Sequence, residues 1–362
     1  MTTPEAPTTT VAPEPVDWAT ARRVARFVAR GDALADSYLG ASLREDFVEL
    51  TAQAEVVVSD FTGLRTPDNV TVDVVDRRGW VDANIVSMRR LLEPLMDRVG
   101  ARLARSPFAP VGRHLAATEM GALIGYLSQR VLGQYDLLVP DDSSGDTVYY
   151  VGPNILALEK RFAFRPRDFR LWIAIHEVTH RAQFAGVPWM RDYFLSLVHQ
   201  AFDVVDPDPS VLLRAVTRAL EEVRRGRNPL DDGGIVGLFA TPEQRAVLAR
   251  VQALMSFLEG HGNVVMTELG HRYVAGEERM ARVLHHRRQA GGVTGQLHKL
   301  LGLEQKMKQY EVGERFINGV VDIVGFGALD AVWTGPENLP ALDELDDPRA
   351  WVTRVQPGRR AG

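Results

Sequence analysis

Residues 169–188, FRLWIAIHEVTHRAQFAGVP, decide how this chain folds and where its chemistry lies. The residues that precede His176 are almost all apolar, which is typical of a helix packed on every side. Asp168 is the expected N-cap, and Gly186 followed by Pro188 predicts the end of the helix. The stretch therefore predicts a buried helix of about five turns that carries a cluster of polar residues.

The polar cluster is His176-Glu177-Val178-Thr179-His180. Residues four apart share one face of a helix, so the two imidazoles can hold a single metal ion. Glu177 follows His176 directly, where its carboxylate can reach a water on that metal. This is the HExxH arrangement of zinc metallopeptidases, with two ligands and a general base. A chance match on a buried helix is the alternative, but burying Glu177 is costly unless a cation pairs with it.

A third ligand is needed, and Glu259 is the preferred candidate. The predicted helix that begins near residue 241 presents apolar residues at three- and four-residue spacing, and Glu259 falls on their buried face. His261 would lie about 200° around the same helix, so both cannot face one metal. Asn263, one turn after Glu259, shares its face and is predicted to accept a hydrogen bond from a ligating imidazole.

The alternatives for the third ligand are His261 and His271. They stay open because Gly260 and Gly262 flank His261 and weaken a helix at this point. If the helix breaks there, the geometry that favours Glu259 no longer holds.

Composition excludes several classes of protein and site. The chain has 362 residues, a net charge of −5 and no cysteine. The acidic balance argues against nucleic acid as a partner, and any zinc site must use histidine and carboxylate ligands. No signal peptide or membrane span is evident, so we expect a cytoplasmic protein without a membrane partner. The oligomeric state is not indicated.

Periodicity predicts a mainly α protein with a small β element. Residues 1–15 are rich in Thr, Pro and Ala and are expected to be a disordered tail. Residues 16–140 are predicted to form an N-terminal helical domain, and 141–362 a catalytic domain. The predicted helices of the first domain lie within 17–63, at 81–99 and at 115–138. Thr147 to Val151 is the clearest strand.

Several segments resemble a known bacterial family. His176 to Tyr193, Leu258 to Met266, Leu301 to Phe316 and Ala331 to Leu339 are similar to a zincin-like metallopeptidase family of unassigned substrate. That family is sometimes labelled as associated with deazaflavin-coenzyme biosynthesis. The pairing of HExxH with Glu259-x-x-x-Asn263 also resembles the gluzincin pattern, except that Asn263 stands where an Asp is usual. The likeness covers nearly all of the chain past about residue 17.

The resemblance implies a zincin-like core with an N-terminal helical domain and a Zn²⁺-dependent hydrolase acting on a peptide or amide. By analogy with zincins, the strand residues Tyr149, Tyr150 and Val151 would bind extended substrate at a sheet edge. The alternative is a strand that only covers the cleft. Tyr310, on a predicted helix, is a candidate to stabilise an oxyanion. A catalytically silent zincin-fold binding or regulatory protein remains the alternative function.

Overall fold

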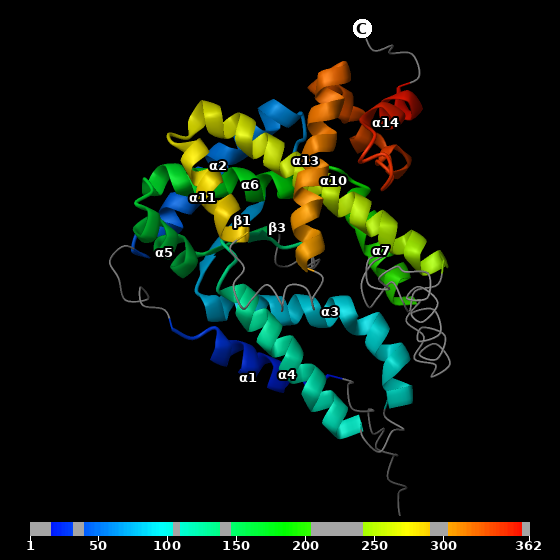
Figure 1. Cartoon of the computed structure of the whole chain (residues 1–362). Helices are drawn as coiled ribbons and strands as arrows, with labels where there is room; N and C mark the ends of the chain where they lie inside the picture. Colours follow the sequence, from blue (N-terminus) through cyan, green and yellow to red (C-terminus); the bar gives the residue numbers. More distant parts are fainter. Residues whose placement is uncertain are drawn as a thin grey trace, which may run out of the picture. The chain divides into compact units, whose positions relative to one another are not determined.

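The computed structural model describes residues 16–31, 40–103, 109–137, 146–203, 242–289 and 303–356 (Figure 1). These residues are mostly helical, with one three-stranded sheet, which confirms the predicted mainly α fold. The predicted tail, residues 1–15, lies outside the described residues.

The described residues form two units. The first takes its residues from positions up to 32 and from 76–131, and the second from 33–75 and 132–362. This grouping differs from the single boundary predicted near residue 140, because the chain leaves and re-enters each unit. Residues 40–75 belong with the part of the chain that carries the HExxH motif, although they precede it by more than a hundred positions.

The first unit is a helical group. It contains α1 (Trp18–Val28), α3 (Arg77–Leu103) and α4 (Ala109–Ser128). Asp17 caps α1 by accepting a hydrogen bond from the N–H of Thr20. Gly121 on α4 allows that helix to touch α1, since a Cβ there would come within 2.9 Å of the Val24 side chain. Small residues thus set the spacing of these helices.

The predicted helix 115–138 is too long. Helix α4 ends at Ser128, and Gly133–Tyr135 form a short strand, β2, in the second unit. The reason is a tertiary contact. The three residues pair with the strand at Asp146–Val151, and this pairing overrides the helical pattern that the preceding residues would otherwise continue.

The sheet lies in the second unit and has the strand order β1-β3-β2. Strand β1 (Val70–Val75), which the sequence analysis did not predict, pairs in parallel with β3 (Asp146–Val151). Strand β2 pairs antiparallel with the other side of β3, with Gln134 opposite Tyr149. The predicted strand at 147–151 is thus confirmed, but it is the central strand of the sheet.

Helices surround this sheet and form the core of the second unit. Phe47 on α2 stacks on the ring of Tyr150 with centroids 3.9 Å apart, and Thr51 lies 2.8 Å from the Tyr150 hydroxyl. The helices of the unit are α2 (Leu43–Thr62), α5 (Gly152–Phe162), α6 (Pro166–Ala185), α7 (Met190–Asp203), α10 (Pro242–Tyr273), α11 (Glu277–Gln289), α13 (Leu303–Val324) and α14 (Pro348–Val355), with 3₁₀ segments η2 (Phe326–Thr334) and η3 (Pro336–Asn338).

The HExxH motif lies on α6, which is buried along most of its length. The predicted N-cap at Asp168 is wrong, because Pro166 occupies the first helical turn and Arg165 is the N-cap. Asp168 lies in the first turn, where a carboxylate is favoured by the helix dipole. The predicted end at Gly186 is confirmed.

A buried arginine fastens α6 to its surroundings. The Arg181 side chain is fully buried and donates to Asp146 at 2.7 Å, to Glu55, and to the Pro67 carbonyl at 2.6 Å. A buried charge is costly unless its partners satisfy it, and here each end of the guanidinium has one. The network links α6 to α2 and to the start of β3, which holds the motif in place.

Helix α10 runs unbroken through Gly260 and Gly262, lies along α6, and is crossed by α13 (Figure 1). Gly260 and Gly313 meet at the crossing of α10 and α13. A Cβ on Gly313 would overlap the carbonyl oxygen of Ser256, and one on Gly260 would overlap the Gly313 backbone. The glycines that weaken an isolated helix therefore allow two helices to touch here.

No single helix in the described part of the chain is both long and apolar enough to cross a membrane. The bent pair of Glu311–Val324 and Phe326–Thr334 meets the length and composition test only when taken together.

Candidate metal centre

Three predicted ligand residues meet between α6 and α10. His176, His180 and Glu259 each offer a ligand atom, and these atoms lie within 4.8 Å of one another. His180 Nε2 is 3.3 Å from His176 Nε2 and 3.6 Å from Glu259 Oε2. Four-residue spacing on α6 and burial of one face of α10 bring together side chains about eighty positions apart.

The separations fit a zinc ion. With bonds of about 2.0–2.1 Å and tetrahedral angles, neighbouring ligand atoms lie about 3.3 Å apart. The separations of 3.3 and 3.6 Å in the structure are close to that value. Two imidazoles and one carboxylate are also the donor set of catalytic zinc sites that keep a position open. His176, His180 and Glu259 can therefore hold Zn²⁺.

Gly262 forms one wall of this group. A Cβ at position 262 would lie 3.3 Å from His180 Cε1 and 3.7 Å from His176 Cε1. The backbone of α10 thus passes directly beside both imidazoles. A larger side chain would crowd the space into which the ring nitrogens point.

Gln183 fixes the orientation of His180 and was not identified from the sequence. Its Nε2 donates to the Leu258 carbonyl at 2.9 Å, so its Oε1 is the atom that faces His180 Nδ1, also at 2.9 Å. A carbonyl oxygen only accepts, so the hydrogen-bond network assigns the proton to His180 Nδ1. The Nε2 lone pair is then directed at the other ligand atoms, as metal binding requires.

His261 supports Gln183 and does not join the ligand group. It is buried, and its Nδ1 lies 3.0 Å from Gln183 Nε2, from which it accepts. Burial, reinforced by the charge of His180, lowers the pKa of His261 to about 3, so its imidazole is neutral. The other alternative, His271, is half exposed and pairs with Glu277 at 3.1 Å.

Asn263 lies one turn after Glu259, as predicted, but the predicted hydrogen bond to a ligating imidazole is not formed. Its Oδ1 is buried and bonds to no residue in the described part of the chain. Gln183 takes the orienting role expected of Asn263, because it follows His180 by three residues on the same helix face.

The carboxylate of Glu177 is buried beside β2. It accepts a hydrogen bond from the backbone N–H of Tyr135, and a Cβ at Gly133 would lie 2.6 Å from its Cγ. Burial raises the pKa of Glu177 to about 7; the charge of Glu259 adds to the rise, while His180 and the Tyr135 N–H oppose it. A carboxylate with a pKa near neutrality suits a group that takes up and releases a proton.

The cluster attracts positive charge. Burial alone would lower the pKa of His180, but its hydrogen bond to Glu259 and the charges of Glu259 and Glu177 outweigh burial. The pKa of His180 rises to about 9 as a result. Two buried carboxylates next to two imidazoles thus hold a proton when no other cation neutralises them.

The predicted substrate edge is wrong. Tyr149, Tyr150 and Val151 lie in β3, which is paired on both sides and has no free edge. The strand that borders Glu177 is β2, whose three residues were too few to show a periodic pattern. Tyr310 lies on α13 as predicted, but its side chain is outside the described residues.

Comparisons with known proteins agree with this geometry. The family model described as zincin-like metallopeptidase matches residues 16–352. A crystal structure from Chloroflexus aurantiacus, described as a "putative hydrolase with a novel fold", is 34% identical with a TM-score of 0.72. The match covers 95% of this chain and 100% of that one. A search among curated proteins gave no match. Since the family model spans more than nine-tenths of the sequence, the chain belongs to the zincin-like metallopeptidase family.

Proposed function

We propose that this protein is a zinc-dependent amide hydrolase, and specifically a metallopeptidase. The observation that carries the proposal is the meeting of His176, His180 and Glu259 with the buried carboxylate of Glu177. A structural zinc site needs no such base, so Glu177 favours catalysis over a silent binding protein.

His176, His180 and Glu259 would hold the metal. Zinc bound in this way lowers the pKa of a water ligand toward neutrality and polarises a substrate carbonyl. Glu177 would accept the water proton on its carboxylate and deliver it to the leaving amine. Its neighbours support that role, since Tyr135 N–H fixes the carboxylate and burial keeps its proton affinity high.

Substrate would bind along the outer edge of β2. Val151 N–H bonds to the Leu132 carbonyl and Asp136 N–H to the Thr147 carbonyl, which sets the antiparallel register. Gly133 and Tyr135 therefore direct their backbone groups away from β3, and the Tyr135 N–H among them is bonded to Glu177. An extended peptide added at this edge would run past Glu177.

A peptide-library cleavage assay tests the proposal. Protein stripped with a chelator and then reloaded with one equivalent of zinc should cleave peptide bonds, and the stripped protein should not. Equal behaviour of stripped and reloaded protein, with no cleavage in either, would favour the silent binding protein.

A further inference from the structure

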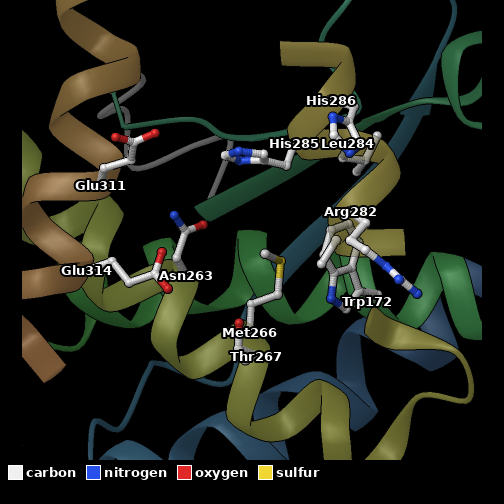
Figure 2. A pocket seen from close by; sticks show the side chains of 11 residues that line it. Trp172, Asn263, Met266, Thr267, Arg282, Leu284, His285, His286, Glu311 and Glu314 are labelled. Atoms are coloured by element: carbon white, nitrogen blue, oxygen red, sulfur yellow. The ribbon is translucent and has the colours of Figure 1, made fainter. Parts of the chain in front are cut away.

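A cavity of about 380 Å³ opens one helical turn from the residues of the metal-ligand group, which consists of His176, His180 and Glu259. It is lined by residues of α6, α10, α11 and α13, all in the second unit (Figure 2). Trp172 lies one helical turn before His176, and Asn263 lies one turn after Glu259. Since four helical residues span about 6 Å, these two lining residues lie about that far along their helices from the ligand residues.

One wall of the cavity is acidic. Glu311 and Glu314 are three residues apart on α13 and line the cavity with exposed side chains (Figure 2). Glu314 follows Gly313, which touches Gly260, so its turn of α13 lies against the turn of α10 that holds Glu259. A single exposed carboxylate attracts a cation only weakly, and two on one wall need a further partner to define a site.

Asn263 supplies that partner. Its side chain is 8% exposed and extends into the cavity on the side of Glu314 (Figure 2). Its Oδ1 is buried and makes no hydrogen bond within the described residues. A buried amide oxygen without a donor is destabilising, so an acceptor left in this position indicates a ligand that donates.

Part of the remaining lining suits an aliphatic stem, while Thr267, His285 and His286 add polar groups to it. Trp172 and Met266 are largely buried, and Leu284 lies across from Glu314. Arg282, which also lines the cavity, points away from the two glutamates (Figure 2). Acceptors at one end, with the apolar side chains of Trp172, Met266 and Leu284 beside them, match an ammonium carried on a hydrocarbon chain.

We infer that this cavity is a substrate subsite for a primary ammonium group, bound by Glu311, Glu314 and the amide oxygen of Asn263. The inference rests on the proposed hydrolase function and adds a substrate class, an amine-bearing peptide or amide. The ammonium has three donors and no acceptor, which suits a site whose carboxylates and amide oxygen are all acceptors. A carboxylate or phosphate ligand would instead be repelled by the charges of Glu311 and Glu314.

A second metal ion is the other cation to consider. Within the described residues, the group formed by His176, His180 and Glu259 is the one whose ligand atoms are close enough to share a metal. The two glutamates and Asn263 are not part of that group, and the apolar side chains beside them favour an organic cation.

Isothermal titration of small probes into full-length, zinc-loaded Glu177→Gln protein tests the subsite without turnover. The probes are Nα-acetyl-lysine methylamide, which has a free side-chain amine, and leucine amide, which has a free α-amine. The third probe, Nα-acetyl-norleucine methylamide, is uncharged. We expect at least one amine probe to bind about tenfold or more tightly than the norleucine probe. A preference for the lysine probe assigns a basic side chain, and one for leucine amide assigns a substrate N-terminus.

The variant Glu311→Gln/Glu314→Gln should abolish that preference and leave the norleucine affinity unchanged. Asp322→Asn, an exposed acid on the same helix outside the cavity, should keep the preference. Equal affinities for all three probes, or the same loss in Asp322→Asn, would overturn the subsite. Cleavage of a peptide library without preference for amines would refute the subsite alone, whereas amine binding without any hydrolysis would refute the proposed function alone.

Discussion

Gly133 and Glu177 are packed so closely that a Cβ on Gly133 would lie 2.6 Å from both Cγ and Oε1 of the carboxylate. The strand that borders the site thus requires glycine at this position in order to accommodate the carboxylate of Glu177, the proposed general base. The contact joins two features that are 44 positions apart, a three-residue strand and the HExxH helix.

Gly133→Ala should displace the carboxylate without disturbing the metal ligands. We expect kcat to fall by about 10- to 100-fold, since a shift of about 1 Å in a catalytic group has effects of that size. Zinc content should be unchanged. Gly40→Ala is the control, because its Cβ would make one ordinary contact at 3.9 Å. Unchanged kcat in Gly133→Ala would show that the contact is not needed for catalysis.

Gln183→Met should weaken zinc binding through His180. The variant keeps the size of the side chain but removes the acceptor for His180 Nδ1 and the donor to the Leu258 carbonyl. Loss of a group that orients a ligating imidazole typically costs about 10- to 100-fold in metal affinity. Competition with a zinc chelator measures the change. Affinity equal to wild type would refute the orienting role of Gln183.

Glu259→Gln and His261→Ala separate the two candidates for the third ligand. Glu259→Gln removes a ligand charge and should weaken zinc binding by more than about 100-fold, a larger loss than for an orienting residue. His261→Ala should retain zinc, because its ring faces Gln183, although stability should fall. Metal analysis after dialysis decides between them. Zinc lost from His261→Ala but kept in Glu259→Gln would indicate a three-histidine site.

Gly313→Ala should destabilise the second unit. Its Cβ would overlap the Ser256 carbonyl at the crossing of α10 and α13, so the helices must move apart. We expect the free energy of unfolding to drop by about 3 kcal/mol in urea denaturation. Gly112→Ala, on a helix with open space around it, should be neutral or slightly stabilising. Equal midpoints for both variants would contradict the close crossing.

The meeting of His176, His180 and Glu259 was predictable because helical periodicity alone places these residues. Four-residue spacing put His176 and His180 on one face, and the phase of the following helix put Glu259 on a buried one. The uncertainty lay in Gly260 and Gly262, which weaken a helix locally. In the structure the helix continues through both glycines, because Gly260 packs against α13 and Gly262 packs against the two imidazoles.

The surroundings of the site were less predictable because they depend on contacts between distant segments. Strand β2 exists through pairing with β3, and its residues were assigned to a helix that ends at Ser128. The order of the strands, which makes β3 central, has no local signal. Gln183 did have one, its three-residue spacing from His180, but the hydrogen bond to Leu258 that fixes its amide depends on the fold.

The most direct test of the account compares wild type and Glu177→Gln protein for zinc content and peptide hydrolysis in the same preparations. The account predicts about one zinc per chain in both proteins and hydrolysis only in wild type, because an amide cannot accept the water proton. Hydrolysis by Glu177→Gln at the wild-type rate, or a wild type that binds no zinc, would contradict it.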